Sequence, residues 1–540
     1  MNRRTFLTAV LGSAAVAATR PLFAAAPSAP ARKPNFLVIL MDDMGYSDPG
    51  CYGGEIATPH IDGLAARGLR FTQCYSTARC WPSRACILTG YYAQQIGRDA
   101  LPSLPGGARG KRPPWARLLP EHLRPLGYRS YHSGKWHVDG KPEAGGFDRV
   151  FQYDETGRHF LPAKLAAEIG PPLGPPQAEG TYASTAIADQ AIRFLRDHAA
   201  NHADRPFFQY LAFTEPHFPI QAMQADIDRY RDRYLAGWDV LREERHKRMT
   251  GLGLINCPLS RSDPDVVPGW NLAAEAMKER IGPGEVAAAV PWAGLTDEQR
   301  RFQAVKMAIH AAMVDRVDRE IGRVIDQLKA MNAFENTVIV FASDNGASAE
   351  VMIRTDGHDP AAPAGSARTH LCLGPGWSTA ANTPFRLHKC WVHEGGISSP
   401  LVVHWPAGMA ARGELRRDPV HFIDLAPTLV DLAGGRWPEA WDGVAVPPTP
   451  GRSLAPDFAR DGAVRHDALW WHHDGHSAVR VGDLKLVSAA PGGPWELYDL
   501  STDRSEMTNL AAAQPEKVKE LAARWAAMAE EFRRQATGAK

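Results

Sequence analysis

The segment CWPSR at residues 80–84 has a cysteine, a proline and an arginine at its first, third and fifth positions. It continues through an apolar turn to LTG at residues 88–90. Pro82 suits the first turn of a helix, because its φ is fixed and it lacks an N–H group. A nucleophile at position 80 would then lie near unpaired backbone N–H groups, where a bound anion is favoured. Arg84 would hold the nucleophile or substrate oxygens through its planar guanidinium. An isolated Cys80 would be a buried structural thiol more often than a nucleophile, so this interpretation depends on the whole pattern.

Four other segments share one design, in which an apolar run is followed at once by polar side chains. The runs cover residues 36–41, 127–133, 206–213 and 337–342, and the second is less apolar than the others. Such runs are typical of strands buried on both faces of a parallel sheet. The polar residues that follow are Asp42, Asp43, Lys135, His137, His217, Asp344 and Asn345. Because ligand sites in open α/β sheets lie outside the carboxyl ends of the strands, we expect these side chains to meet.

Two of the strand ends supply four oxygen-bearing side chains, those of Asp42, Asp43, Asp344 and Asn345. Hard oxygen donors without sulfur suit Ca²⁺, or else Mg²⁺, and do not suit zinc. Either pair alone is more often a turn or a helix cap. Together with Cys80 as a fifth member, the pairs predict a calcium site, with magnesium as the alternative.

Histidine titrates nearest neutrality, so His137 and His217 are the candidate proton carriers. Lys135 and Lys389 are candidate cations for anionic substrate oxygens and for the leaving group. Each of these residues, taken singly, is more often a surface or a satisfied polar residue. Their positions at strand ends favour a functional role for Lys135, His137 and His217, whereas Lys389 depends on the resemblance described below.

The rest of the pattern indicates a fold in two parts. Apolar residues recur at helical spacing over residues 185–198 and 301–331, and residues 220–300 indicate an insertion over the sheet. From about residue 447, short strand-like units broken by Gly and Asp precede an amphipathic helix over residues 515–536. We expect an α/β catalytic domain over residues 34–446, with a large, mixed, mostly parallel sheet flanked by helices. A smaller C-terminal domain with an antiparallel sheet and a helix would follow over residues 447–540.

Size, charge and the first residues narrow the class of protein. A length of 540 residues leads us to expect two or three domains. The net charge of +1 gives no broad basic surface, so neither nucleic acid nor an anionic membrane is an expected partner. Residues 1–26 resemble a twin-arginine export signal, because Arg3 and Arg4 precede an apolar run too short for a membrane helix. The sequence therefore predicts a periplasmic or secreted bacterial protein without stable membrane insertion. An uncleaved N-terminal anchor is the alternative.

On these motifs the chain resembles the type I sulfatases, in particular the bacterial arylsulfatases, within the alkaline phosphatase superfamily. The resemblance covers roughly residues 34–530. Its markers are the Cys80 motif, DDMG at 42–45, TPHID at 58–62, GKWH at 134–137, Pro216-His217, DNG at 344–346, EGG at 394–396, ELYDL at 496–500 and NLA at 509–511. The resemblance implies an alkaline-phosphatase-like fold and the hydrolysis of aryl or carbohydrate sulfate esters.

The resemblance also assigns roles. A formylglycine-generating maturation enzyme would oxidise Cys80 to Cα-formylglycine, and Asp42, Asp43, Asp344 and Asn345 would bind calcium together with residue 80. One hydroxyl of the aldehyde hydrate would attack sulfur and expel the alcohol, and loss of a proton from the second hydroxyl to His137 would release sulfate. His217 and Lys389 would stabilise or protonate the leaving group, and Arg84 and Lys135 would orient the hydrate and the sulfate. The twin-arginine machinery carries folded proteins, so residue 80 would be modified before export.

Three positions depart from the commonest family pattern, and two other functions stay open. Trp81 stands where a small residue is common, and Tyr91 and Ser398 stand where basic residues are frequent. None of these departures removes a proposed ligand or catalytic group. A phosphonate or phosphate ester hydrolase of the same superfamily, and a catalytically silent carbohydrate-binding relative, are the alternatives. The sequence does not distinguish a small aryl sulfate from a sulfated sugar as the substrate.

Overall fold

The computed structural model describes residues 32–100, 110–153, 158–160, 166–354 and 357–537. The export signal expected over residues 1–26 lies outside the described residues. No helix in the described part of the chain combines the length and the apolar character needed to cross a membrane. All seven cysteines are described, and each is a free thiol.

A mixed ten-stranded sheet forms the centre of the described structure, in the order β10-β2-β8-β7-β1-β6-β3-β4-β5, with β9 paired to β2. The strands are β1 (Asn35–Met41), β2 (Leu69–Tyr75), β3 (Arg129–Lys135), β4 (Arg149–Tyr153), β5 (Ala166–Ile169), β6 (Phe207–Ala212), β7 (Thr337–Ser343), β8 (Ser398–His404), β9 (Glu414–Arg416) and β10 (Val420–His421). Strands β7, β1, β6, β3 and β4 are neighbours and run parallel. Strand β8 is antiparallel to β7 and β2, and β5 is antiparallel to β4. The expected mostly parallel sheet is confirmed.

The four expected site-bearing strands end level with one another. In β1, Leu40 pairs with Ala212 of β6 and with Ala342 of β7. In β3, Gly134 also pairs with Ala212. The residues that follow these strands therefore leave the sheet at one edge, as the sequence predicted.

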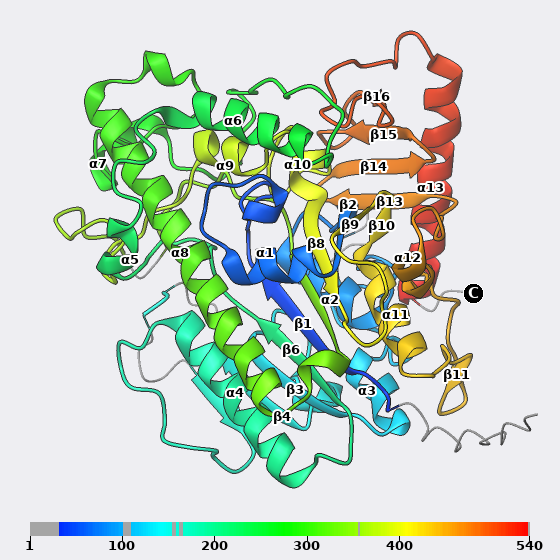
Figure 1. The fold of residues 1–540 in the computed structure, drawn as a ribbon. Helices are drawn as coiled ribbons and strands as arrows, with labels where there is room; N and C mark the ends of the chain where they lie inside the picture. Colours follow the sequence, from blue (N-terminus) through cyan, green and yellow to red (C-terminus); the bar gives the residue numbers. More distant parts are fainter. Residues whose placement is uncertain (1–31, 101–109, 154–157, 161–165, 355–356, 538–540) are drawn as a thin grey trace, which may run out of the picture.

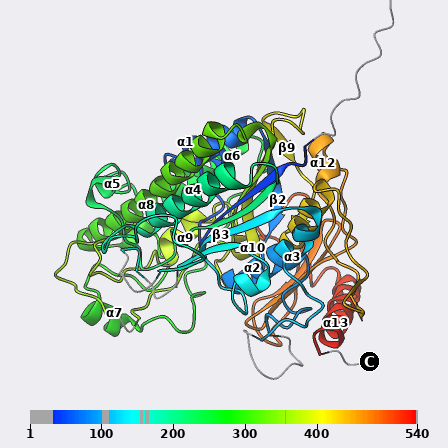
Figure 2. The same ribbon diagram turned by 90° about the horizontal axis from the view of Figure 1, so that it is seen from below.

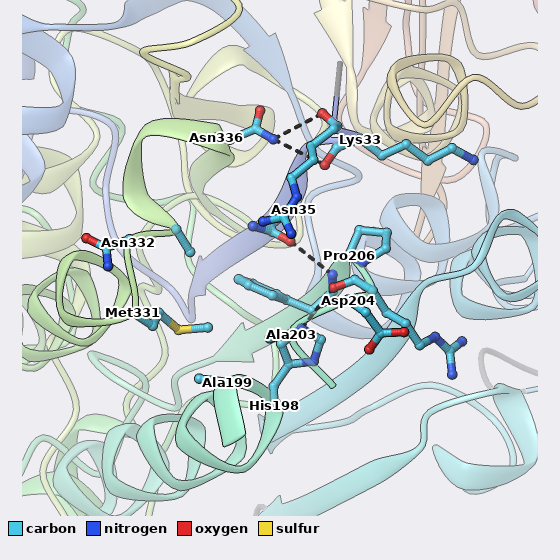
Figure 3. Close-up of a pocket in the computed structure, with 14 residues that line it drawn as sticks. Lys33, Asn35, His198, Ala199, Ala203, Asp204, Pro206, Met331, Asn332 and Asn336 are labelled. Carbon is cyan, nitrogen blue, oxygen red and sulfur yellow. Dashed lines mark hydrogen bonds between the residues drawn. The ribbon is translucent and has the colours of Figure 1, made fainter. Parts of the chain in front are cut away.

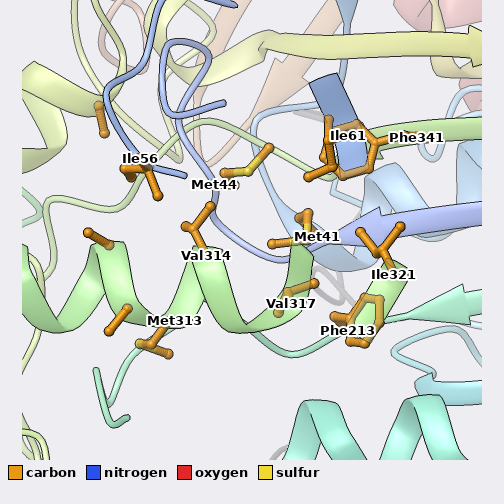
Figure 4. Packing of buried hydrophobic residues seen from close by; sticks show 14 of the residues in the cluster. Met41, Met44, Ile56, Ile61, Phe213, Met313, Val314, Val317, Ile321 and Phe341 are labelled. Carbon is orange, nitrogen blue, oxygen red and sulfur yellow. The ribbon is translucent and has the colours of Figure 1, made fainter. Parts of the chain in front are cut away.

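Two layers of helices enclose the sheet, because the side chains of each buried strand alternate between its faces (Figures 1 and 2). On one face, Leu37, Ile39 and Met41 pack with α1 (Pro59–Ala66), α4 (Ala183–Asn201) and α8 (Asp297–Ala330). Figure 4 shows this core, in which Met41 lies against Val314 and Val317 of α8. On the other face, Phe36, Val38 and Leu40 pack with α2 (Cys80–Thr89), α3 (Leu119–Leu123) and α11 (Leu425–Leu432).

The insertion and the C-terminal region complete the molecule. Residues 220–300 contain α5 (Gln224–Asp228), α6 (Gly237–Gly251) and α7 (Ala274–Arg280), and α9 (Pro375–Ala381) and α10 (Glu394–Ile397) follow β7. A small hairpin, β11 (Ala440–Trp441) and β12 (Val444–Ala445), precedes α12 (Ala455–Ala459). The C-terminal antiparallel sheet consists of β13 (Leu469–His473), β14 (His476–Val481), β15 (Leu484–Ser488) and β16 (Glu496–Asp499), beside α13 (Pro515–Thr537). In Figure 1 the insertion (green) and this sheet (orange) lie at the same end of the molecule.

Candidate active site

The four oxygen-bearing side chains predicted at the ends of β1 and β7 lie together and are buried. Asn345 donates from Nδ2 to Asp43 Oδ1 at 2.6 Å, and the backbone N–H of Asp43 donates to Asp344 Oδ1 at 3.3 Å. Asp43 has a φ of 66°, a left-handed conformation that turns the chain sharply after β1. Asp42, Asp43, Asp344 and Asn345 are each no more than 3% exposed. Three carboxylates and one amide therefore converge in a dry site.

This cluster fits an oxygen-binding divalent cation. Asp42 Oδ1 and Asn345 Oδ1 are buried and have no hydrogen-bond partner among the described residues. Burial, partly opposed by Lys135, raises the pKa of Asp42 to about 7. Burial also raises the pKa of Asp344 against the opposing charge of Arg84. Unpaired hard oxygens and carboxylates that are costly to ionise without another cation suit Ca²⁺ or Mg²⁺.

Cys80 is the first residue of α2, so a helix begins at this motif as its proline predicted. The Cys80 residue is 2% exposed. The hydroxyls of Thr77 and Ser83 lie 2.9 Å apart, and Ser83 Oγ accepts from the backbone N–H of Thr77 at 3.1 Å. These contacts fix the turn that carries residue 80. Cys80 lies one turn before Arg84 on α2, and Arg84 binds Asp344, so residue 80 lies beside the carboxylate cluster.

Arg84 lies one turn further along α2 and is fully buried. Its Nε and Nη2 lie 2.8 and 2.7 Å from Asp344 Oδ2, and its Nη1 donates to the carbonyl of Lys135 at 3.2 Å. The sequence indicated contacts with the nucleophile or the substrate. In this structure, Arg84 holds a carboxylate of the candidate metal site and the end of β3, and its predicted contact with the nucleophile or the substrate stays a prediction.

Both candidate lysines direct their ammonium groups at the carboxylates. Lys135 Nζ donates to Asp42 Oδ2 at 2.6 Å, and Lys389 Nζ donates to Asp43 Oδ2 at 2.8 Å. Lys389 also lies 3.5 Å from Glu350 Oε2. Burial alone would lower the pKa of Lys389, but Asp43 and Glu350 outweigh it and raise the pKa well above its ordinary value. These two carboxylates therefore favour the protonated form of Lys389.

Of the two candidate histidines, His217 lies near the carboxylate cluster and His137 contacts the cysteine motif. His217 Nδ1 lies 2.6 Å from the carbonyl of Phe218, which can only accept, so Nδ1 carries a proton. Its Nε2 lies 3.7 Å from Asp43 Oδ2 and is the nitrogen that can exchange a proton. His137 has a φ of 53°, and its ring meets the Trp81 ring edge-on at 5.7 Å. The structure thus brings all the predicted site residues to one end of the sheet.

A small cavity opens beside this cluster and is lined in part by residues that sequence reasoning missed. Its lining is Asp42, Lys135, Tyr153, Arg158, His159, Thr214, His217 and Phe218. His159 lies 3.3 Å from Glu215 Oε1, and its Nε2 lies 2.9 Å from the carbonyl of His217. His159 therefore positions the loop that carries His217. Nothing around His159 resembles a motif, because its partners are more than 50 residues away in sequence.

A larger cavity, of about 620 Å³, lies at the opposite edge of the sheet (Figure 3). It is lined by residues that begin strands, such as Asn35 and Phe207, and by His198, Met331 and Asn336. At about 3.3 Å per residue, seven-residue β1 separates the two edges by roughly 20 Å. Among its described residues this cavity has three cationic side chains, those of Arg32, Lys33 and Arg205, but Asp204 is the single carboxylate. It therefore lacks the group of carboxylates that a cation site needs, and the chemistry places the site at the carboxyl edge in spite of the difference in size.

Comparison with known proteins supports this assignment. The family model described as Sulfatase matches residues 34–435, and the model described as N-sulphoglucosamine sulphohydrolase, C-terminal, matches residues 385–535. An uncharacterized sulfatase of Schizosaccharomyces pombe is 31% identical, over 92% of this chain and 93% of that protein. An arylsulfatase of Klebsiella aerogenes is 30% identical, over 78% of this chain and 91% of that protein. An N-acetylglucosamine-6-O-sulfatase of Bacteroides thetaiotaomicron is 27% identical, over 91% of this chain and 85% of that protein.

Solved structures share the fold. The structure of Ps i-CgsB in complex with k-i-k-neocarrahexaose has a TM-score of 0.63 at 22% identity, over 94% of both chains. A phosphonate monoester hydrolase from Silicibacter pomeroyi has a TM-score of 0.55 at 19% identity, over 91% of this chain and 94% of that chain. The Sulfatase model covers well over half of the sequence, and it includes the Cys80 motif and both halves of the carboxylate cluster. The chain belongs to the type I sulfatase family and is a sulfatase.

Proposed function

We propose that this sulfatase hydrolyses sulfate esters with a formylglycine derived from Cys80 and a calcium ion held at the carboxylate cluster. The observation that carries the proposal is the position of Cys80. It begins a helix one turn before Arg84, which binds Asp344, at the sheet edge where Lys135 and Lys389 contact the other two carboxylates. A nucleophile, hard oxygen ligands and fixed cations at one point are what displacement at an anionic sulfur centre requires.

The metal would be held by Asp42, Asp43, Asp344 and Asn345 together with residue 80. Asp42 Oδ1 and Asn345 Oδ1 are the unpaired buried atoms that would gain a partner. When bound, the cation polarises the sulfate and favours ionisation of the attacking hydroxyl that the formylglycine hydrate supplies. Arg84 fixes Asp344 through two nitrogens, so that this carboxylate keeps one orientation.

Proton transfer falls to the two histidines, and charge stabilisation falls to Lys389. His217 uses Nδ1 to donate to the carbonyl of Phe218. Its Nε2 is therefore the atom that protonates the leaving oxygen or stabilises its negative charge. Lys389 stabilises the negative charge that develops there, because its ammonium group stays protonated. His137, on the Trp81 side of the site, would accept the proton whose loss releases sulfate.

Relatives suggest two classes of substrate. The Klebsiella relative is named an arylsulfatase and the Bacteroides relative an N-acetylglucosamine-6-O-sulfatase. We propose that this chain acts on an organic sulfate ester of one of these two kinds. The fold of a phosphonate monoester hydrolase keeps a phosphonate or phosphate ester as the second candidate. A higher kcat/KM for an aryl phosphodiester than for an aryl sulfate would establish the second candidate and reject the first.

Replacement of two cysteines in the same helix tests the nucleophile. Cys80→Ala is expected to leave the fold intact and to abolish sulfatase turnover, because the formylglycine cannot form. Cys86→Ala, six residues further along buried α2, is the control and is expected to retain activity. Mass spectrometry of the peptide that contains residue 80 should show the aldehyde in protein produced with its maturation enzyme. An unmodified thiol in fully active protein, or an active Cys80→Ala variant, refutes the assignment.

A further inference from the structure

A guanidinium group lies between two indole rings beside the proposed nucleophile. Arg79, which directly precedes Cys80, has its Cζ 5.1 Å from the ring centre of Trp81 and 5.3 Å from that of Trp270. Both distances are within the range of cation–π contacts. The two tryptophans come from different parts of the chain, since Trp81 lies in the cysteine motif and Trp270 in the insertion. This stack therefore joins the insertion to the start of α2.

Trp270 is exposed and yet held in place. It is 44% exposed, while its Nε1 donates to Glu350 Oε1 at 2.9 Å. The next residue, Asn271, donates to the carbonyl of Ala349 at 3.1 Å and accepts from the N–H of Val351 at 2.9 Å. Single exposed apolar side chains are common and carry no meaning alone. An indole fixed by three hydrogen bonds in this segment presents a rigid face to solvent, which is unusual for a surface ring.

The stack is connected to the chemistry by Glu350. One oxygen of this carboxylate accepts from Trp270, and the other lies 3.5 Å from Lys389 Nζ. Arg79 lies 3.7 Å from the same carboxylate. Trp270 is thus two contacts away from the lysine that serves the leaving group.

A carboxylate from the C-terminal sheet completes this rim. Asp474, at the turn between β13 and β14, has a side chain that is 37% exposed. Its Oδ2 lies 3.2 Å from His473 Nε2 and 3.7 Å from Arg79 Nη1. Two cationic partners orient the carboxylate and leave part of it open to accept further hydrogen bonds.

We propose that Trp270, Arg79 and Asp474 form a subsite for a pyranose ring, so that the substrates are sulfated carbohydrates. This inference rests on the proposed function of the site. A flat, rigid indole matches the C–H face of a sugar, and a half-open carboxylate accepts from sugar hydroxyls. A simple aryl sulfate has no hydroxyl donor for Asp474. The rim therefore distinguishes the two substrate classes that the sequence left open.

The test compares two probes with matched surface variants. We would measure kcat/KM for 4-nitrophenyl sulfate and for the best of a panel of monosulfated pyranosides, and take the ratio of pyranoside to aryl sulfate. Trp270→Ala is expected to lower this ratio about tenfold, mainly through KM, and Trp270→Phe to restore most of it. Leu252→Ala, at a residue that is 41% exposed on the insertion and outside the rim, is the control and should leave the ratio unchanged.

The outcomes separate this inference from the proposed function. A ratio that changes less than twofold in Trp270→Ala overturns the pyranose subsite. Hydrolysis of the aryl sulfate by the unaltered protein, with no turnover of any pyranoside, also overturns it while the proposed function stands. Absence of turnover for both probes, in protein with formylglycine at residue 80, refutes the proposed function itself.

Discussion

Replacement of Lys485 by methionine should destabilise the protein strongly, because Lys485 is the centre of a buried charge network between the two domains. Lys485, on β15, is fully buried, and its Nζ donates to Glu394 Oε1 at 3.0 Å and to Glu506 Oε1 at 2.9 Å. Arg504 reaches the other oxygen of Glu394 at 3.1 Å. Methionine has a similar length and no charge, so Lys485→Met removes the cation that binds both buried carboxylates, while Glu394 keeps Arg504.

The size of the effect follows from the pKa of Glu394. Burial alone would raise this pKa, but Lys485, Arg504 and Arg480 outweigh burial and lower it from 4.5 to about 2. At about 1.4 kcal/mol per pKa unit, this depression corresponds to about 3 kcal/mol. That figure is the net effect of all three cations against burial, whereas loss of one partner from a buried ion pair costs about 3–5 kcal/mol. We therefore expect Lys485→Met to lower the free energy of unfolding by about 3 kcal/mol near neutral pH.

The pH dependence has a definite sign. A carboxyl with a depressed pKa in the folded state stabilises the fold above its ordinary pKa, and this contribution is lost as the pH falls from about 4.5 towards 2. Lys485→Met raises the pKa of Glu394, so the variant should begin to unfold in acid at a higher pH than the unaltered protein.

Urea and acid titrations followed by tryptophan fluorescence measure both effects. Lys517→Met is the control, because Lys517 makes a partly exposed pair with Glu520 on α13 and surface pairs contribute little. The double variant Glu394→Gln, Lys485→Met should recover part of the loss, since it removes one unpaired charge. A loss below about 1 kcal/mol in Lys485→Met, or equal losses in Lys485→Met and Lys517→Met, would show that the network contributes no net stability.

The remaining predictions concern the metal and the leaving group. Dialysis against EDTA should lower sulfatase activity, and added Ca²⁺ or Mg²⁺ should restore it better than Zn²⁺. The reason is that the proposed ligands around residue 80 are all hard oxygens. Better recovery with zinc than with calcium or magnesium would contradict this ligand set. Lys389→Met should lower kcat/KM by about 100-fold for an ester with a poor leaving group, and much less for 4-nitrophenyl sulfate, whose phenolate needs little stabilisation. An equal loss for both esters would mean that Lys389 acts elsewhere in the reaction.

The fold and the members of the site could be predicted from sequence because the signals are local. Apolar runs that stop abruptly mark β1, β6 and β7, and the residues directly after them, such as Asp42 and Asp344, form the site. The helices at 183–201 and 297–330 begin and end within a few residues of the periodic segments. These features depend only on spacing of about two or 3.6 residues along the chain.

The partners of the site residues could not be predicted, because they come from distant segments. Arg84 binds Asp344, which lies 260 residues later, a partner that the motif did not indicate. Glu350 follows β7 by several residues and belongs to no motif, yet it links Lys389 to Trp270. The contribution of Asp474 depends on how the C-terminal sheet docks onto the α/β domain. Sequence patterns therefore indicate which residues belong to the candidate site, whereas tertiary packing decides which partner each of them contacts.

The docking of the C-terminal sheet also explains how Lys389 keeps its place. The segment that carries it is bound at several points, since the N–H of Lys389 donates to the carbonyl of Ala347 at 3.1 Å and that of Cys390 to the carbonyl of Ala78 at 2.8 Å. Its far end is Glu394, whose N–H donates to Glu506 and whose carboxylate binds Lys485. The C-terminal sheet therefore does more than cover the α/β domain, because it fixes one end of the loop that carries Lys389 and supplies Asp474 to the proposed subsite. It follows that Lys485→Met should lower kcat as well as stability, whereas a C-terminal sheet that only covers the core would lower stability alone.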